Sequence, residues 1–599
     1  MRTENRFMCN RRKEWSVATV GFRRDRNCSS VDIAVENSVL YRRILSGIVV
    51  VPEFPVSEFF FRDLGQVEEL LQRYLRAILP LKRRDRPTFT DYGVFDYADV
   101  LDDYAVEYTG AGDETMIEEL RSMFTNAVNW DCVGTLYNVH PNLSLHAQVA
   151  SFVSSFANPN LGQDVSSGQF AATERSLVRI MSELAGWATD GRGIFTFGGK
   201  ATSLYGVKLA LDRHQPDLRR RGLVGRPVVL STDVGHPCHV EVCNWLGIGE
   251  DNCDRLPTTA GVLDPEVLAA ALRAHYRSGA TPVCIVATGC STNSHSVDRF
   301  AEIADVAGAV AAEFGAVRPW LHVDAVIGWV YLLLARYDFV GNPLDIPEQV
   351  ATILHNKYRM MADVKFADSF GIDFHKTGFA GYNSSLFLTR HPEILHSIEG
   401  GYVESDPMRF SDYSPYLYSL ELSRSAHGPV SAWAALRSLG FEGFTRILAD
   451  QTAGYLRLKQ LLGADSRFQV LNRTEESNLV LVTLLPPDLE QVDADTPPDA
   501  VARVRALNEQ FHRFVIAQHA ESASPVFFSI SRGYDFDGLQ LAPVKLYSFN
   551  SHFDRAAAEA NYAAIVDLVH RFGRDSAGVG YFNWIEFMQL KDTRGRAAQ

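Results

Sequence analysis

The sequence predicts an α/β protein built on a mostly parallel sheet with helices on both faces. Short apolar runs rich in β-branched residues alternate with longer stretches of helical periodicity, an order typical of strand–helix–strand units. The composition is that of a globular chain, with 46% hydrophobic and 22% charged residues among 599. A chain of this length holds roughly four domains or fewer.

Acidic residues outnumber basic ones, 72 to 58, which gives a net charge of −14. A field of this sign disfavours nucleic acid and anionic membranes as partners. No stretch reaches the roughly 18 consecutive apolar residues of a membrane helix, and the basic N-terminus lacks the apolar core of a secretory signal. Eight cysteines without a Cys-x-x-Cys pair favour a reducing compartment, so the protein is expected in the cytoplasm.

The first part of the chain is dominated by helical periodicity. Residues 1–45 show no clear pattern and are treated as an extension of uncertain order, and residues 46–135 are expected to form a helical N-terminal segment. Its two helices are expected over 56–79, stopped by Pro80, and over 100–130, with Ile117, Leu120 and Met123 on one face.

The central part of the chain predicts the sheet and forms a large domain over 136–437. A helix is expected over 173–187, and another over 298–314 with Asp298 as its N-cap. The expected strands are Arg226–Thr232, Pro282–Thr288, Trp320–Asp324 and Ser384–Thr389.

The last part of the chain predicts a smaller α+β domain over 438–575, followed by a tail over 576–599. Two Pro-Pro-Asp sequences within 485–505 predict a surface loop, and residues 506–520 are helical again.

A double glycine, Gly198-Gly199, stands between an apolar run and a good helix. Glycines at a helix N-terminus let backbone N–H groups approach a phosphate, which the helix dipole also favours. The P-loop pattern is not met, because Ile194 stands at its first glycine and Ala201 follows Lys200. Taken alone, this feature supports a phosphate site and a plain helix cap equally.

Two further positions place reactive groups at strand ends. Asp324 ends an apolar strand, where open α/β sheets bind ligands, although a helix cap explains it as well. Lys376 follows His375 at a strand-to-loop junction. A desolvated lysine becomes a nucleophilic amine, whereas an ordinary lysine simply lies at the surface.

His236 follows the strand 226–232, where its ring could stack on an aromatic ligand. A zinc site here would need Cys238, His239 or Cys243, but the usual ligand spacings are absent. Taken together, these features supply the groups that one cofactor needs: the phosphate turn, His236, Asp324 and Lys376. This set suits pyridoxal phosphate, which needs a phosphate anchor, a ring-stacking group, a partner for its ring nitrogen and a lysine.

In these residues the sequence resembles the group II pyridoxal-phosphate-dependent amino-acid decarboxylases, the family of aromatic amino-acid, tyrosine and glutamate decarboxylases. The similarity runs from Tyr137 to Leu439 and continues more weakly beyond. The matching segments are Thr196–Ser203, Ser231–Gly249, Ala287–Asp298, His322–Ala325, Ala367–Lys376, Ser423-Arg424 and Trp433.

The resemblance implies the aspartate-aminotransferase fold, fold type I, usually as an obligate homodimer with the active site at the interface. It implies that pyridoxal 5'-phosphate binds covalently to Lys376, that Asp324 pairs with the pyridine nitrogen, and that His236 stacks on the ring. The implied phosphate contacts are Gly199, Lys200 and His375, and Thr292 is implied to border the cofactor.

Departures from the family pattern indicate a divergent member, with valine decarboxylase as one comparison. The family's substrate segment corresponds here to Tyr137, Asn138 and His140, which include no Lys or Arg for an acidic side chain. We therefore expect a neutral substrate, aromatic or aliphatic. The departures are Lys200, Val326 and Phe374.

The expected reaction is decarboxylation of an L-amino acid to its amine and carbon dioxide. A tyrosine of the segment 401–423 is implied as the proton donor, and Tyr416 is favoured over Tyr402, Tyr413 and Tyr418. An aminotransferase or an aldehyde synthase would use the same lysine and aspartate. A non-catalytic homologue and a metal hydrolase built on His236, Cys238 and His239 are the remaining alternatives, and no metal is expected.

Overall fold

The computed structural model describes residues 64–90, 110–187, 191–398, 412–472, 476–520 and 524–576. The chain divides into two compact units, residues 1–72 and 73–599. Of the first unit only the start of helix α2 (Leu64–Ile78) is described, so all that follows concerns the second unit. The predicted extension over 1–45 lies outside the described residues, as does nearly all of the predicted tail.

A seven-stranded sheet forms the centre of the second unit, in the order β2-β10-β9-β8-β7-β3-β4. Strand β10 is antiparallel to both of its neighbours, and all other pairs are parallel. The predicted mostly parallel sheet is therefore confirmed. Its strands are β2 (Arg192–Thr196), β3 (Pro227–Thr232), β4 (Cys253–Leu256), β7 (Thr281–Thr288), β8 (Trp320–Asp324), β9 (Ser369–Asp373) and β10 (Ser385–Thr389).

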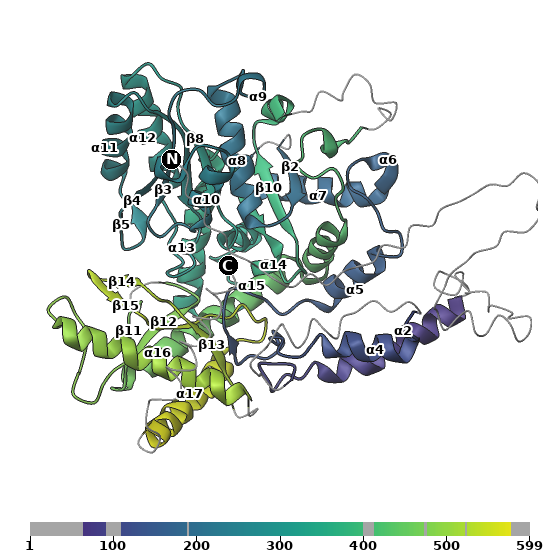
Figure 1. The fold of residues 1–599 in the computed structure, drawn as a ribbon, viewed down its shortest axis with the longest axis vertical. Helices are drawn as coiled ribbons and strands as arrows, with labels where there is room; N and C mark the ends of the chain where they lie inside the picture. The colour runs from purple at the N-terminus through teal and green to yellow at the C-terminus, as the bar shows by residue number, and fades with distance from the viewer. Residues whose placement is uncertain are drawn as a thin grey trace, which may run out of the picture. The chain divides into compact units, whose positions relative to one another are not determined.

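Helices cover both faces of this sheet (Figure 1). One face packs against α8 (Gly199–His214), a helix buried over most of its length, and against α10 (Cys238–Trp245). The other face packs in one continuous apolar core against α7 (Gln169–Leu184), α11 (Pro265–Arg277), α12 (Phe300–Glu313) and the buried 3-10 segment η4 (Gly328–Arg336).

A smaller five-stranded sheet, in the order β1-β13-β16-β12-β11, forms the C-terminal part together with two helices. Strand β1 lies more than 300 residues before the others yet pairs with β13, so the predicted boundary between 135 and 136 falls inside β1. The elements are β1 (Thr135–Leu136), β11 (Phe468–Val470), β12 (Val480–Leu484), β13 (Phe527–Ile530), β16 (Val544–Leu546), α16 (Pro498–Ala520) and α17 (Arg555–Ser576).

A long helical element, α15 (His427–Ala464), is interrupted at Gly440, whose positive φ of 62° breaks the helix into two. Its first half packs against α5 (Leu145–Ser154), and its second half contributes to the C-terminal core. The remaining α-helices are α4 (Asp113–Ser122), α6 (Asp164–Ser167), α9 (Leu218–Arg221), α13 (Glu348–Ala362) and α14 (Phe374–Thr377). Two small hairpins are also present: β5 (Thr258–Thr259) pairs with β6 (Val262–Leu263), and β14 (Tyr534–Phe536) pairs with β15 (Leu539–Leu541).

Three local predictions are wrong. Of the described part of the helix expected over 100–130, only α4 is helical, and Met123 lies exposed just beyond its end. Asp298 does not cap α12, which begins at Phe300, because its carboxylate accepts the backbone N–H groups of Leu263 and Thr288 at 2.9 and 2.7 Å. The predicted loop over 485–505 ends early, because α16 begins at Pro498. Proline is suited to the first helical turn, where its missing N–H costs nothing.

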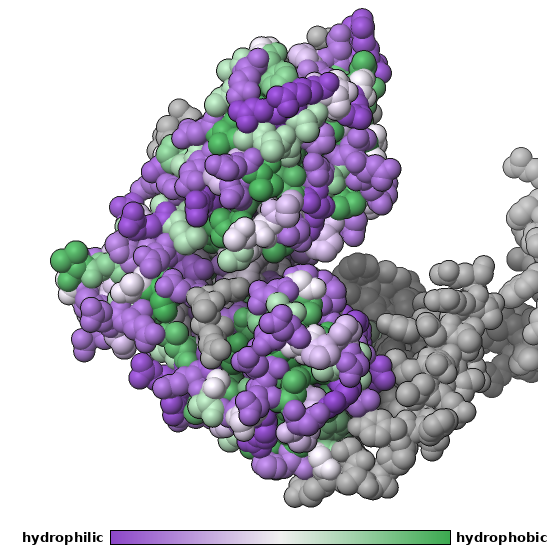
Figure 2. All heavy atoms as spheres, turned by 90° about the vertical axis from the view of Figure 1, so that its left-hand side faces the viewer, coloured by the Kyte–Doolittle hydropathy of each residue, from purple (hydrophilic) through white to green (hydrophobic). Residues whose placement is uncertain are grey.

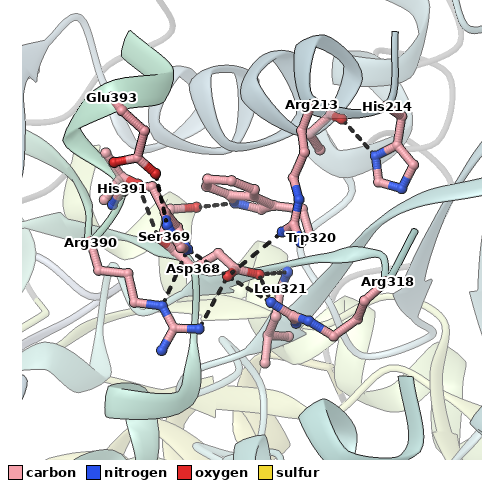
Figure 3. A network of polar contacts seen from close by, with 12 residues as sticks. Arg213, His214, Arg318, Trp320, Leu321, Asp368, Ser369, Arg390, His391 and Glu393 are labelled. Atoms are coloured by element: carbon pink, nitrogen blue, oxygen red, sulfur yellow. Dashed lines mark hydrogen bonds and ion pairs between the residues drawn. The ribbon is translucent and has the colours of Figure 1, made fainter. Parts of the chain in front are cut away.

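A buried carboxylate, Asp368, ties together the ends of three neighbouring strands (Figure 3). Arg318 contacts both carboxylate oxygens at 2.7 Å, and the Leu321 N–H donates at 2.8 Å. Arg390 and His391, which follow β10, approach at 3.2 and 2.9 Å. Burial opposes ionisation, but His391 and Arg318 outweigh it and hold the pKa of Asp368 well below its usual range.

The surface on the side of α11, α12 and α16 is mostly hydrophilic, with apolar residues scattered among polar ones (Figure 2). Among the described residues, no helix combines the length and the apolar character needed to cross a membrane.

Removing the charge of Asp368 is expected to destabilise the fold strongly. Asp368→Asn leaves the partly exposed guanidinium groups of Arg318 and Arg390 without their buried counter-ion. Breaking a fully buried pair costs about 3–5 kcal/mol, and solvent near the two arginines should reduce the cost toward the lower end of that range. The measurement is urea unfolding followed by circular dichroism. Glu442→Gln, which breaks an exposed ion pair with Arg446, serves as the control and should cost less than about 1 kcal/mol. Equal stability of the two variants would contradict the role given to Asp368.

Candidate active site

The predicted reactive residues lie where three neighbouring parallel strands end. Asp324 is the last residue of β8, and it lies opposite Thr288 at the end of β7. Strand β9 ends at Asp373 and leads directly into the single turn of α14, which carries His375 and Lys376. Because the strands are parallel, their carboxyl ends gather these side chains at one edge of the sheet.

Asp324 is held by a histidine that the sequence offered only as a zinc candidate. His239 Nε2 lies 3.1 Å from Asp324 Oδ2, and its Nδ1 lies 2.6 Å from the hydroxyl of Ser231. Burial opposes the charge, but the bond to His239 and the nearby Lys376 lower the pKa of Asp324 well below its usual range. The carboxylate is therefore ionised, as a partner for a protonated ring nitrogen must be.

Lys376 is paired with a second carboxylate. Its Nζ lies 2.7 Å from Oδ2 of Asp373, whose side chain is fully buried. The other oxygen of Asp373 accepts a 2.5 Å hydrogen bond from the hydroxyl of Ser385 on β10. Burial opposes the charge of Lys376, but Asp373 and Asp324 outweigh it, and the pKa of the ammonium group is raised.

The predicted phosphate turn borders the same space. Gly198, the N-cap residue of α8, has a φ of 142°, which a side chain would strain. A Cβ on Gly199 would lie 2.6 Å from Oδ2 of Asp373 and 3.1 Å from Cγ1 of Val326, so only glycine fits. The ammonium of Lys200 forms an ion pair with Glu241, on α10.

His236 stands on the turn between β3 and α10, with its ring exposed. Its Nδ1 accepts the N–H of Cys238 at 3.1 Å. Arg255 fixes the turn by donating to the carbonyl oxygens of Asp233, Gly235 and His236. Partial desolvation, helped by the nearby Lys376, lowers the pKa of His236 against the opposing effect of Asp324, which favours a neutral ring suited to stacking.

Aromatic contacts bring one of the predicted pocket residues to the site. The ring of His140 stacks on Trp130, with centroids 3.9 Å apart, and meets the ring of Tyr382 at 4.9 Å. Tyr382 in turn stands 4.0 Å from the ring of His375. Burial lowers the pKa of both histidines, His140 and His375, to about 4, so both rings are neutral at neutral pH.

Other predicted residues are less tightly connected to this group. Tyr137 packs on Phe527, with ring centroids 5.0 Å apart, and Asn138 beside it is exposed. Thr292 is half-buried on the loop after β7. Tyr416 lies on the short segment η8 (Pro415–Leu417), where its N–H donates to the carbonyl of Gly162 at 3.2 Å.

Sequence reasoning missed three members of the site, namely Asp373, Tyr382 and the role of His239. Asp373 carried a usable signal, because a carboxylate three residues before a lysine faces it across one helical turn. The contacts of His239 and Tyr382 join distant segments and left no such signal. Among the described residues, no group of three or more His, Cys, Asp or Glu is arranged to hold a metal ion.

The residues present fit pyridoxal phosphate. The α8 N-terminus supplies backbone N–H groups beside a glycine that no side chain can replace, which suits a phosphate. Asp324 supplies an ionised carboxylate, His236 an exposed neutral ring, and Lys376 the amine. Each requirement of the cofactor thus has a partner at one edge of the sheet.

Comparisons with known proteins agree with this geometry. A family model described as the pyridoxal-dependent decarboxylase conserved domain matches residues 99–484. The acidic amino acid decarboxylase GADL1 of Bos taurus is 27% identical over 368 residues, covering 59% of this chain and 64% of that protein. The chain thus spans less than two thirds of that relative's length.

Two solved structures share the fold. Mouse CSAD in its apo form has a TM-score of 0.71 at 19% identity, covering 84% of this chain and 99% of that one. The structure of Oryza sativa TDC with PLP and tryptamine has a TM-score of 0.67 at 18% identity, covering 86% and 99%.

Adding a methyl group at Gly199 is expected to weaken cofactor binding. The Cβ of Gly199→Ala would contact Asp373 and Val326, and overpacking of this kind costs about 1–3 kcal/mol, or roughly tenfold to a hundredfold in affinity. The measurement is titration of the apo-protein with pyridoxal phosphate. Gly463→Ala, in a helix with nothing within 4 Å, is the matched control and should bind normally. Wild-type affinity in Gly199→Ala would contradict the assignment of this turn.

Proposed function

Because the chain belongs to the pyridoxal-dependent decarboxylase family, we propose that it removes the carboxylate of an amino acid as carbon dioxide and releases the amine. Membership confirms the predicted family, the predicted fold type and the predicted cofactor, pyridoxal phosphate. The observation that carries the proposed reaction is the placement of the Lys376 amine and the ionised Asp324 at adjacent strand ends.

The roles of the residues follow from their surroundings. When bound, pyridoxal phosphate supplies an electron sink through its protonated pyridine ring. Asp324 would keep that ring protonated, His236 would stack on it, and Lys376 would bind the cofactor covalently. Gly199, Lys200 and His375 would face the phosphate, and Thr292 would border the ring. Lys200 reaches a phosphate only by leaving Glu241, its partner in the structure.

We propose Tyr416 as the group that returns a proton to the α-carbon. Of the other candidates, Tyr402 lies outside the described residues, and Tyr413 is committed to a buried hydrogen bond with Glu174 at 2.9 Å. Burial raises the pKa of Tyr418 to about 12, beside the same glutamate, which makes it a poor donor. Tyr416 is half-buried on η8 (Pro415–Leu417), within the segment that the family resemblance implies for the donor.

A neutral amino acid is the substrate that we propose. Lys200 is paired with Glu241, and Arg255 is bound to three carbonyl oxygens, so neither is positioned for an acidic side chain. The pocket that we propose comprises Tyr137, Asn138 and His140, with Tyr382 beside it. The alternative is an acidic amino acid, because the bovine relative is named for that activity.

The expected partner is a second copy of the chain, with the active site at the interface. Helix α5 and Phe156, two residues beyond its end, expose apolar side chains at helical spacing, with exposed fractions from 49% to 71%. An exposed apolar stripe of this length is typical of a protein–protein contact. The stripe comprises Leu145, Val149, Phe152, Val153 and Phe156.

The cytoplasm is the compartment that we propose. All six cysteines within the described ranges are unpaired and buried, in keeping with a reducing environment.

Product analysis tests the reaction and the substrate together. The protein, supplied with pyridoxal phosphate, is incubated with a pool of L-amino acids, and products are identified by mass spectrometry. We expect the amine of a neutral amino acid and no product from Lys376→Ala. A keto acid as product would show an aminotransferase instead of a decarboxylase, and an aldehyde would show an aldehyde synthase. An amine formed from glutamate, aspartate or cysteine sulfinate would overturn the proposal of a neutral substrate.

The same assay tests the proton donor. Tyr416→Phe should lower amine output by about a hundredfold or more, the usual contribution of a general acid. Tyr413→Phe is the matched control, and its output per folded molecule should stay close to that of the wild type. An unchanged output from Tyr416→Phe would contradict the assignment.

The oligomeric state tests the partner. Analytical ultracentrifugation should find the wild type as a dimer and Phe152→Asp as a monomer, because a charge within the apolar stripe cannot be buried. Val340→Asp, at an exposed apolar position on the loop between η4 and α13, is the control and should stay dimeric. A dimer of Phe152→Asp as stable as the wild type would place the interface elsewhere.

A further inference from the structure

Asp373 is a buried carboxylate whose two oxygens have different tasks. Oδ1 is fixed to the sheet by the hydroxyl of Ser385 at 2.5 Å. Oδ2 faces the ammonium of Lys376 at 2.7 Å, and Nε2 of His375 lies 3.5 Å away. The neutral ring of His375 leaves Lys376 as the cation that compensates this carboxylate.

The same oxygen also borders the phosphate turn. A Cβ on Gly199 would lie 2.6 Å from Oδ2 of Asp373, so the backbone of the turn passes directly beside the carboxylate. A phosphate that enters this turn meets a carboxylate of its own sign, while the amine it needs is held by that carboxylate. Asp373 therefore borders both the turn that would bind the phosphate and the amine that would bind the aldehyde of the cofactor.

We propose that Asp373 is a positioning residue that locks Lys376 as an ammonium ion in the empty site, so that release of one proton limits covalent capture of the cofactor. This proposal concerns cofactor capture alone and does not depend on which amino acid is decarboxylated. An ammonium ion has no lone pair, and only the neutral amine attacks a carbonyl carbon.

The capture step balances without a further reactant. Nζ of Lys376 bonds to the aldehyde carbon of pyridoxal phosphate, a C=N double bond forms, and the aldehyde oxygen leaves as water. The ammonium group supplies two protons to that water and one to solvent. No electron is gained or lost overall.

Several charged or titratable groups face Lys376, and Asp373 has the largest favourable effect on its charge. Asp324 ends β8 and also favours the ammonium form, as does Tyr382 after α14. Burial works against them. The other groups that respond to the charge of Lys376 are His236, Cys238 and His375.

The first test uses the wild-type apo-protein. The rate of pyridoxal phosphate capture is followed by absorbance in a stopped-flow instrument between pH 6 and 9, and the product is confirmed by borohydride reduction and mass. We expect the rate constant to rise about tenfold per pH unit across this range, as the neutral amine fraction rises. A rate that levels off below pH 7 would overturn the lock.

The second test removes the charge while keeping the shape. Asp373→Asn should capture the cofactor at least about tenfold faster at pH 7 and should level off at lower pH than the wild type. Asp345→Asn, which removes an exposed carboxylate from a distant loop, is the matched control and should follow the wild type. If Asp373→Asn does not fold, a wild-type rate that levels off below pH 7 would still overturn the proposal.

The third test separates the lock from simple repulsion of phosphate. Pyridoxal, which carries no phosphate, is captured by the same amine. A lock on Lys376 accelerates capture of both pyridoxal and pyridoxal phosphate in Asp373→Asn. Acceleration of pyridoxal phosphate alone would show that Asp373 merely repels the phosphate, and an unchanged profile for both would overturn the proposal.

Discussion

The interaction on which the sheet most depends is the ionised, fully buried Asp368. Its carboxylate joins the N–H of Leu321 on β8 to cations from the loop before β8 and from the segment after β10. Its own backbone leads into β9. Removing one partner of a buried charge is costly, so these contacts favour the alignment of the three strands that the structure shows. Asp324 and Lys376 lie at the opposite ends of two of these strands, and their separation follows from that alignment.

The active site rests on two further buried carboxylates that differ in their partners. Asp324 is held by a histidine whose far nitrogen is itself held by Ser231. Asp373 is held by Ser385 and by the ammonium group of Lys376. The first arrangement keeps a negative charge permanently available to a ring nitrogen. The second pairs a negative charge with the amine of Lys376, so under the roles proposed above the two carboxylates would act at different steps of cofactor binding.

Much of the fold could be predicted because its signals are local. The runs at 226–232, 282–288, 320–324 and 384–389 each became strands of the central sheet within one residue at either end. Lys376 and Asp324 were found because strand ends are recognisable in sequence. Asp298 was wrongly predicted as a helix N-cap because a carboxylate before a helix usually is one. Here its carboxylate instead accepts hydrogen bonds from the backbone N–H groups of Leu263 and Thr288. Strand β1 and the partners of Asp324 and His140 depend on contacts across hundreds of residues, which no local pattern carries.

The pairing of β2 with β10 sets an order on how the molecule can assemble. Thr196 lies opposite Ser385, so pairing this edge closes a loop of chain that contains β3, β4 and β7 to β9. Closing so long a loop carries an entropic cost that shorter loops avoid, and contacts remote in sequence form slowly. The glycine turn after β2 and the lysine before β10 meet through this closure. A newly made chain therefore lacks a complete cofactor site until β2 and β10 have paired. Cofactor binding would then indicate that the central sheet has folded.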